Sequence, residues 1–310
     1  MEKSFKLPTL DFYNTDLLKQ GSNEWNSLRD EVFKAFQEYG CFEVMFDKVK
    51  PRDLLEEIKE IFNFPLEFKM SKSSTMFGYL GQNPTLPLYE RLTIQDVLSH
   101  GIAKKFAHLF WPDGNPIVCD MVLSYSKQLS MLEKTIRRMV MEILGVEKYI
   151  EEQNESSNYV LIFNKYRKPT RDESGIGLAP HTDKNILTIL FQIQVNGLQI
   201  QRVNGQWVDV EFSPNSFLVL VGDVFKAWTN GRLHAPIHRV LMSRKDEERF
   251  SIGFFTFPKE GYLVNVPKEL VDEDHPLLYK PFDGIKYIQF YKSESGQRAS
   301  HDSLKAYCGV

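Results

Sequence analysis

The segment Gly177–Gln192, GLAPHTDKNILTILFQ, places two metal-donor side chains directly before an apolar run. In an extended chain, residues two apart point to the same face, so His181 and Asp183 can approach one ion while Thr182 points away. The β-branched and apolar residues that follow are typical of a barrel strand. His and Asp are also common in polar turns, so HTD alone does not identify a metal site. A third donor has to come from elsewhere in the chain.

Short runs of β-branched and aromatic residues continue along the second half of the chain. They are separated by Gly, Pro, Asn and Asp, and this texture predicts a series of short strands in a sandwich or jelly-roll barrel. The predicted strands lie in NYVLIFNKY, NILTILFQI, GLQIQRV, QWVDVEF, SFLVLVGD, HRVLMS and RFSIGFFTF.

The first half has apolar residues at helical spacing instead. Helices are predicted in NEWNSLRDEVFKAFQEYG, PRDLLEEIKEIFNFP and YSKQLSMLEKTIRRMVMEILGVEKYIEE. No repeat or linker separates the two halves, so we expect one folded unit over 1–310. It would consist of a mostly helical N-terminal region, 1–150, a jelly-roll core, 158–260, and a C-terminal tail, 261–310, that is again polar and helical.

Composition favours a small-molecule partner. A net charge of −3, with 42% hydrophobic and 25% charged residues, creates no strong field for nucleic acid or an anionic membrane. The N-terminus shows no apolar leader, and no run approaches ~18 apolar residues. Cys41, Cys119 and Cys308 lie far apart in the sequence, which suits a reducing compartment. We therefore expect a cytoplasmic protein, monomeric by default, without a nucleic-acid or membrane partner.

Two histidines of LHAPIHRV compete for the third donor position. Their spacing resembles the helical pair of a metalloprotease, but Pro236 between them disfavours a helix, and no Glu follows His234. In an extended chain His234 and His238 lie ~13 Å apart, too far to share an ion. His238 is the better candidate because it begins the apolar RVLM run, whereas His234 precedes it in a loop. A purely structural role for His238 stays open at this point.

An arginine on the next predicted strand adds an anion-binding function. We expect HRVLMS and RFSIGFFTF to form a hairpin in which Met242 pairs with Arg249. Strand parity then puts His238, Arg249 and Ser251 on one face. The ~13 Å between His238 and Arg249 along the ribbon suits a short dicarboxylate that binds a metal at its other end. The guanidinium fork holds a carboxylate with two hydrogen bonds, the serine hydroxyl adds a third, and Tyr166 offers a phenol.

These residues, in this order, resemble the signature of the plant iron(II)- and 2-oxoglutarate-dependent dioxygenases. Five further segments are similar to that family: LPTLDF, EYGCFEV, FNFPLEFK, GLQIQRVNGQWVDV and PNSFLVLVGDVFKAWTNGR. FWPDGNP, HTDKNILTIL and the ending AYCGV are similar to the branch of glucosinolate side-chain-modifying (AOP-like) dioxygenases and their relatives in alkaloid and steroidal glycoalkaloid pathways. The resemblance runs along nearly the whole chain.

The resemblance implies a mainly β fold, a double-stranded β-helix (jelly-roll, cupin-like) core with surrounding helices. It implies His181, Asp183 and His238 as the catalytic iron ligands. It also implies that Arg249, Ser251 and Tyr166 bind 2-oxoglutarate, with O2 as the other co-substrate and ascorbate as reductant. The chain departs from the family pattern in the RKPT that follows Tyr166 in place of a proline-proline-cysteine run, and in a turn one residue longer before Arg249.

The expected reaction is the hydroxylation of a plant specialised metabolite such as an alkaloid, a steroidal glycoalkaloid or a glucosinolate, with succinate and CO2 as co-products. The alternatives are a related non-heme iron oxidase that does not use 2-oxoglutarate, a non-catalytic binding protein on the same fold, and a zinc hydrolase. Asp223 is interpreted as a turn residue. Four aromatic residues are candidates for the apolar wall of the substrate site or for the core: Phe77, Tyr79, Phe191 and Phe255.

Overall fold

The structure is a computed structural model of the 310-residue chain. It describes residues 6–14, 18–74, 76–81, 83–193, 195–243, 247–299 and 302–310. The α-helices are α1 (Asn23–Glu38), α2 (Pro51–Lys59), α3 (Leu66–Ser71), α4 (Ile102–Phe110), α5 (Pro116–Ile143), α6 (Ile150–Glu155), α7 (Asp223–Trp228), α8 (Gly284–Lys292), α9 (Glu294–Arg298) and α10 (Ser303–Cys308).

Fourteen strands are present in the same described part of the chain. They are β1 (Thr9–Asp11), β2 (Cys41–Met45), β3 (Phe77–Leu80), β4 (Tyr89–Ile94), β5 (Ser157–Tyr166), β6 (Ile176–His181), β7 (Leu187–Ile193), β8 (Leu198–Gln201), β9 (Trp207–Asp209), β10 (Ser216–Val221), β11 (His238–Leu241), β12 (Arg249–Pro258), β13 (Leu263–Val264) and β14 (Phe282–Asp283).

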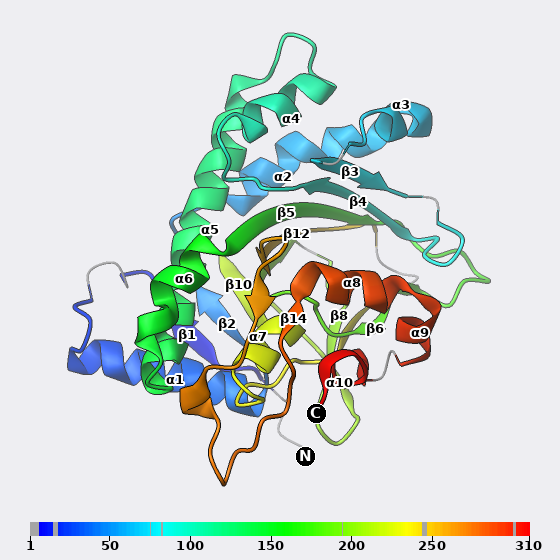
Figure 1. Cartoon of the computed structure of the whole chain (residues 1–310). Helices are drawn as coiled ribbons and strands as arrows, with labels where there is room; N and C mark the ends of the chain where they lie inside the picture. Colours follow the sequence, from blue (N-terminus) through cyan, green and yellow to red (C-terminus); the bar gives the residue numbers. More distant parts are fainter. Residues whose placement is uncertain are drawn as a thin grey trace.

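Two sheets form the core of the fold. The larger has the strand order β1-β2-β10-β7-β12-β5-β4-β3, and the smaller has the order β6-β11-β8-β9. From β5 to β12 the chain crosses repeatedly between the two sheets, as β5, β6 and β7 show. This arrangement is a double-stranded β-helix with helices around it, as the sequence predicted (Figure 1).

The central strand β12 sets the register of the large sheet. It pairs antiparallel with β5, placing Arg249 opposite Tyr166, and with β7, placing Ser251 opposite Gln192. Side chains alternate between the faces of a strand, so every second residue of β12 shares the face of Arg249. That face looks into the space between the two sheets, and the opposite face packs against helices.

Helix α1 begins and ends at capping residues. The hydroxyl of Ser22 accepts a hydrogen bond from the Trp25 amide at the start of α1, and Gly40 follows the helix with a φ of 70°. Glycine adopts this left-handed conformation without steric cost. A side chain at Gly40 would also meet the His234 carbonyl at 2.3 Å, so α1 packs directly on the loop before His238.

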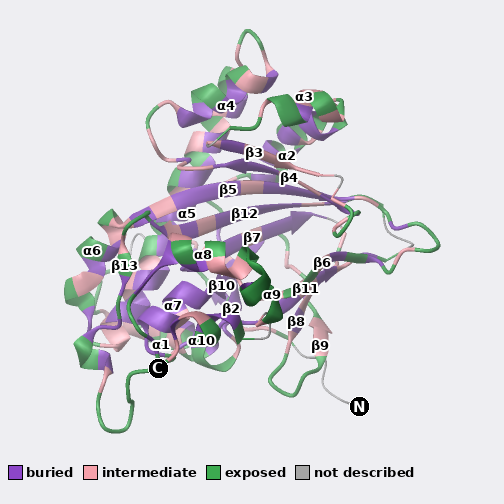
Figure 2. Ribbon diagram, turned by 45° about the vertical axis from the view of Figure 1, so that its right-hand side comes forward, coloured by how far each residue is buried: buried purple, intermediate pink, exposed green. Residues whose placement is uncertain are grey.

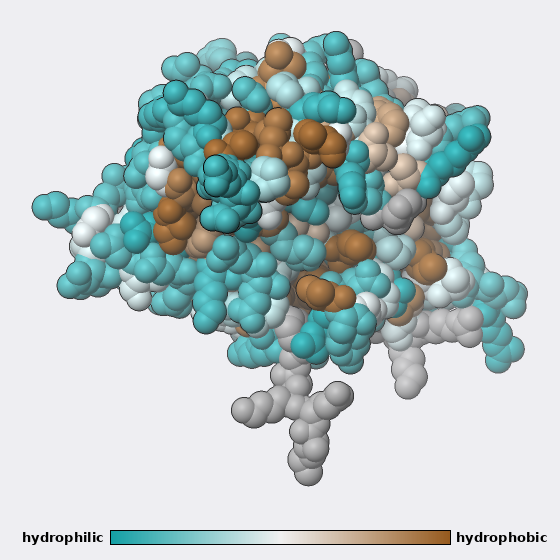
Figure 3. Space-filling model, turned by 60° about the horizontal axis from the view of Figure 1, so that its bottom comes forward, coloured by the Kyte–Doolittle hydropathy of each residue, from teal (hydrophilic) through white to brown (hydrophobic). Residues whose placement is uncertain are grey.

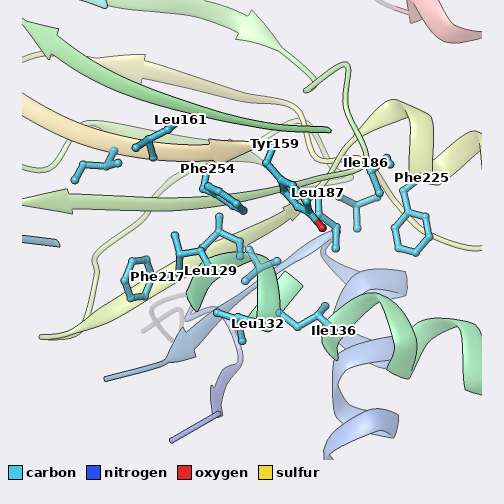
Figure 4. Packing of buried hydrophobic residues seen from close by; sticks show 14 of the residues in the cluster. Leu129, Leu132, Ile136, Tyr159, Leu161, Ile186, Leu187, Phe217, Phe225 and Phe254 are labelled. Atoms are coloured by element: carbon cyan, nitrogen blue, oxygen red, sulfur yellow. The ribbon is translucent and has the colours of Figure 1, made fainter. Parts of the chain in front are cut away.

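Helix α5 covers the outer face of the large sheet. Leu129, Leu132 and Ile136 of this helix lie against apolar side chains from the sheet, including Phe217 and Phe254 (Figure 4). All are at most 3% exposed, so water is excluded from this side. Figure 2 shows the same division: the strands are largely buried, whereas the outer helices expose one face.

One expectation about local structure is wrong. The predicted hairpin of HRVLMS and RFSIGFFTF does not form, because β11 pairs with β6 and β8 in the small sheet while β12 lies in the large one. The N-terminal region also contributes strands: β1, β2, β3 and β4 extend the large sheet at its two edges. Strands β3 and β4 pair with each other at one of these edges.

The surface is mainly hydrophilic, with apolar side chains gathered near the middle of the face seen in Figure 3. In the described ranges, no helix is long and apolar enough to cross a membrane. The division of the chain into a helical region, a core and a tail stays a prediction. Strands β1 to β4, which belong to the N-terminal region 1–150, complete the large sheet of the core.

Candidate functional site

The site lies between the two sheets, where the last residue of β6 meets the first residue of β11. His181 and His238 are direct cross-strand partners, and their ring centroids are 4.3 Å apart. HTD therefore begins at the end of a strand, and Asp183 follows in the turn toward β7. The pairing of β6 with β11 brings together residues that are 57 positions apart in the chain.

The Asp183 carboxylate faces both imidazoles. Its Oδ1 lies 3.7 Å from Nε2 of His181 and 3.7 Å from Nε2 of His238. The three ligand atoms lie within 4.8 Å of one another, and no other such group of His, Cys, Asp or Glu occurs in the part of the chain that the structure describes. The side chains are 19%, 12% and 9% exposed for His181, Asp183 and His238, so an ion there is reachable on one side only.

Backbone carbonyls orient both imidazoles. Nδ1 of His181 lies 2.8 Å from the Ala179 carbonyl, and Nδ1 of His238 lies 3.2 Å from the Pro236 carbonyl. A carbonyl only accepts, so each Nδ1 carries the proton and each Nε2 presents a lone pair to the site. Burial, reinforced by the neighbouring His238, lowers the pKa of His181 to about 4, which keeps this imidazole neutral at physiological pH.

A hydroxyl on β7 fixes the carboxylate. Thr188 donates a hydrogen bond to Oδ2 of Asp183 at 2.6 Å, and the Asn185 amide donates to the Thr188 hydroxyl at 3.0 Å. Oδ2 is thereby occupied, and Oδ1 is left to face the two histidines. Supporting contacts of this type hold ligands in place and tune the affinity for the metal. The sequence contained no signal for Thr188, because the contact depends on how the turn folds.

Arg249 lies deeper between the sheets and has no acidic partner in the described ranges. It is 1% exposed, donates from Nη2 to Oε1 of Gln192 at 2.7 Å and from Nη1 to the Ser251 hydroxyl at 3.4 Å, and leaves Nε without a partner. Burial lowers its pKa. A buried cation without a counter-charge is costly, so the site is built for an anion that supplies one.

Tyr166 and Asn164 complete the wall beside Arg249. The Arg249 guanidinium lies 5.1 Å from the Tyr166 ring centroid, and the Asn164 amide donates to the Ser251 hydroxyl at 3.3 Å. Gly177 of β6 packs on this tyrosine so closely that a Cβ there would lie 2.7 Å from the ring. The small sheet therefore closes the anion pocket from the other side.

Asp223 joins the metal-binding turn to the C-terminal helices. Its backbone amide donates to the Asp183 carbonyl at 2.7 Å. Its Oδ2 accepts hydrogen bonds from the Thr182 hydroxyl at 2.9 Å, from Nζ of Lys184 at 2.8 Å and from the Tyr287 hydroxyl of α8 at 2.7 Å. Asp223, interpreted from sequence as a turn residue, is the first residue of α7 and is 3% exposed. The hydrogen-bond network around Asp223 was not predicted from the sequence.

The four aromatic residues that were candidates for the wall of the substrate site lie in different environments. Phe77 and Phe191 are buried against other core rings, those of Phe106 and Phe217. The Tyr79 hydroxyl donates to Glu90 at 2.6 Å. Phe255 alone among the four shares the inner face of β12 with Arg249, and it is half-buried.

The chemistry of the donor set fits a metal with open coordination positions. Two neutral imidazoles and one carboxylate occupy one side of an ion, an arrangement suited to iron(II) and to oxygen activation. A structural zinc site is usually closed by four protein ligands, and a fourth is not found among the described residues. Independently of the metal donors, the Nε of Arg249 has no hydrogen-bond partner in the described ranges and can donate to the carboxylate of a bound molecule.

Comparisons with known proteins agree with this chemistry. Residues 157–258 match the 2OG-Fe(II) oxygenase superfamily. The chain is 41% identical over 304 residues to a probable 2-oxoglutarate-dependent dioxygenase, AOP1, of Arabidopsis thaliana, covering 95% of this chain and 99% of AOP1. The rice dioxygenase for auxin oxidation superimposes with a TM-score of 0.80 at 27% identity, covering 98% of this chain and 100% of that one. JOX2 in complex with 2OG, Fe and JA has a TM-score of 0.78 at 27% identity, covering 94% and 87%.

Proposed function

Because the chain belongs to the plant 2-oxoglutarate- and iron(II)-dependent dioxygenases, we propose that it hydroxylates a plant specialised metabolite such as an alkaloid, a steroidal glycoalkaloid or a glucosinolate. The enzyme uses iron(II), 2-oxoglutarate and O2. When bound, iron and 2-oxoglutarate supply the oxidising chemistry, with succinate and CO2 as co-products. Ascorbate is the proposed reductant that keeps the iron in its ferrous state.

His181, Asp183 and His238 are the proposed iron ligands. The convergence of their donor atoms within 4.8 Å supports this role, as does the orientation of both Nε2 atoms by backbone carbonyls. The contribution of the chain is to keep the three ligands on one side of the ion and to leave the other side for the co-substrates.

Arg249, Ser251 and Tyr166 are the proposed partners of the distal carboxylate of 2-oxoglutarate. The observation that carries the proposal is the fully buried guanidinium without an acidic partner in the described ranges. A carboxylate there would receive parallel hydrogen bonds from the guanidinium and one from the serine hydroxyl. The phenol of Tyr166, whose pKa burial raises, stays protonated and can donate as well.

The proposed enzyme is a single unit that acts as a monomer in the cytoplasm on a small molecule, with no nucleic-acid or membrane partner. The net charge of −3 supports the absence of polyanionic partners. Cys41, Cys119 and Cys308 are all free thiols, which supports a reducing compartment.

The alternatives account for less of the site. An oxidase without 2-oxoglutarate, or a zinc hydrolase, has no use for a buried arginine without an acidic partner among the described residues. A non-catalytic binding protein does not require three metal donors whose ligand atoms converge within 4.8 Å.

The reaction is tested with plant metabolite extract, iron(II), ascorbate, 2-oxoglutarate and ¹⁸O₂. Hydroxylation predicts a product in which mass spectrometry finds one ¹⁸O atom, formed together with succinate. His181→Ala should abolish the product, whereas His275→Ala, a change of an exposed histidine outside the site, should not. A product that loses hydrogen or a methyl group without gaining ¹⁸O would replace hydroxylation by desaturation or demethylation. A product formed without succinate would overturn the proposal.

A further inference from the structure

A second arginine faces the space between the sheets. Arg91 of β4 is the direct cross-strand partner of Asn164, and Asn164 is the partner of Ser251. Directly paired residues of neighbouring strands point to the same face of a sheet. Arg91 therefore lies on the inner face of the sheet, in one cross-strand row with Asn164, Ser251 and Gln192. Ser251 and Gln192 of this row accept hydrogen bonds from Arg249.

This guanidinium is partly exposed and forms no ion pair with a carboxylate in the described ranges. Glu90, the adjacent acid, points to the other face of β4, where it accepts hydrogen bonds from Nζ of Lys69 at 2.7 Å and from the Tyr79 hydroxyl at 2.6 Å. Among the residues that the structure describes, Arg91 thus has no carboxylate partner.

Tyr89 stands between the two arginines. Its hydroxyl donates to Oδ1 of Asn164 at 2.7 Å, and its ring stacks on Tyr166 at 4.9 Å. Arg91 lies two residues from Tyr89 on the same face of β4, and Arg249 is the direct cross-strand partner of Tyr166, the ring on which Tyr89 stacks. In the register of the sheet, Arg91 on β4 and Arg249 on β12 are separated by β5, so each can serve a different ligand.

The charges of the co-substrate site are already balanced without Arg91. The two positive charges of iron(II) and the one of Arg249 would equal the negative charges of Asp183 and of the two carboxylates of 2-oxoglutarate. Buried or half-buried charges are stable when they are paired. A further cation in the same enclosure calls for one more anionic group, and the remaining occupant of the site is the substrate.

The inner surface next to Arg91 is apolar and partly exposed. Four residues with these properties lie on this face of the strands: Leu80, Ile162, Leu190 and Phe255. Their neighbours on the outer face, such as Leu161 and Phe254, are completely buried. A substrate in this space would contact an apolar wall along its body and one guanidinium at an edge.

We infer that Arg91 binds an anionic group, a carboxylate or a sulfate, on the substrate, and that the enzyme therefore acts on an organic anion with an apolar body. The inference rests on the proposed function, because it assigns 2-oxoglutarate to Arg249. Arg91 is a substrate-binding residue in this account and plays no part in holding the co-substrate.

The first experiment separates the roles of the two arginines without turnover. Calorimetry under nitrogen measures the affinity of the iron(II) enzyme for 2-oxoglutarate in Arg91→Gln, Arg249→Gln and the surface control Arg52→Gln. We expect Arg249→Gln to weaken binding roughly 10- to 100-fold, as the loss of a charge-assisted hydrogen bond does, and the other two to bind as the wild type. A loss in Arg91→Gln as large as that in Arg249→Gln would overturn the inference.

The second experiment identifies the charge of the substrate. Plant metabolite extract is divided by anion exchange into an anionic and a neutral fraction, and each is incubated with the iron(II) enzyme, ascorbate, 2-oxoglutarate and ¹⁸O₂. We expect the labelled product to come from the anionic fraction, and its fragmentation, by loss of CO2 or of SO3, to distinguish a carboxylate from a sulfate.

Variants of Arg91 complete this test. For the labelled metabolite, Arg91→Gln should raise KM roughly 10- to 100-fold, and Arg91→Lys should recover part of the loss because it restores the charge. A labelled product from the neutral fraction with an unchanged KM in Arg91→Gln would overturn the inference and leave the proposed function intact. Failure of every reaction to form succinate would instead count against the proposed function itself.

Discussion

Thr188 and Gln192 lie four residues apart on β7, and each contacts one end of the site: Thr188 donates to Asp183 at 2.6 Å, and Gln192 accepts from Arg249 at 2.7 Å. Four residues along a strand span about 13 Å. Because the side chains at both ends reach inward, the remaining gap suits a metal ion with a short dicarboxylate. A single strand thus sets the distance between the proposed metal site and the anion pocket.

Removing the Thr188 hydroxyl should weaken the metal site more than the fold. Thr188→Val keeps the shape but leaves Oδ2 of Asp183 without its donor, so the carboxylate can rotate. We expect the affinity for iron(II) to fall about 10- to 100-fold, measured by metal titration under nitrogen. The matched control is Thr256→Val on β12, where the buried hydroxyl has no partner in the described ranges. It should not change metal affinity, and equal effects of the two variants would refute the positioning role of Thr188.

Replacing Arg249 by an apolar residue should separate co-substrate binding from stability. Arg249→Met removes a buried cation that has no acidic partner in the described part of the chain, so without 2-oxoglutarate the variant should be as stable as the wild type or more stable. With iron(II) already present under nitrogen, adding 2-oxoglutarate should raise the Tm of the wild type and leave that of Arg249→Met unchanged. A rise of equal size in both proteins would show that the anion binds elsewhere.

The Tyr287 hydroxyl should anchor the C-terminal helices. Tyr287→Phe removes its hydrogen bond to Asp223 and its contact with the Ser303 hydroxyl at 2.9 Å. We expect a loss of about 1–2 kcal/mol in unfolding free energy and faster amide hydrogen exchange in α8–α10. Tyr307→Phe is the control, because this ring packs 5.4 Å from Tyr287 but its hydroxyl has no hydrogen bond in the described ranges. Unaltered exchange in Tyr287→Phe would argue against the anchor.

His234 should make stability depend on pH near neutrality. Burial, together with Lys226, lowers its pKa below the value of about 6.5 that a histidine has in the unfolded chain. Below pH 6.5 the unfolded state therefore binds the proton more readily, so this contribution to stability is complete above that pH and is lost as the pH falls. Urea unfolding at pH 7.5 and 5.5 should show a smaller loss for His234→Gln than for the wild type. Equal losses would exclude this residue as a source.

The sequence predicted what depends on short spacing. The strand after HTD, the place of His238 at the start of a strand with His234 before it, and a helix that ends before Gly40 all follow from local periodicity and residue chemistry. The jelly-roll core follows from the succession of short strands. These features are determined by residues a few positions apart, whose preferences can be evaluated along the chain.

The rest depended on strand pairing between distant segments. The hairpin expected between β11 and β12 is wrong because the barrel pairs β11 with β6 and β8, and neither pairing has a local signal. Arg91 and Thr188 escaped notice for the same reason: the first acquires its place from the pairing of β4 with β5, and the second from the fold of the turn that precedes it.

The central claim is that His181, Asp183 and His238 hold an iron ion that couples the conversion of 2-oxoglutarate to the oxidation of a substrate. The most direct measurement quantifies succinate and oxidised product in the same reaction, for the wild type and for Asp183→Ala, with circular dichroism to verify that both are folded. The account predicts equimolar succinate and product in the wild type, dependent on iron(II), and neither in Asp183→Ala. Product without succinate, or undiminished formation of both in a folded Asp183→Ala, would contradict it.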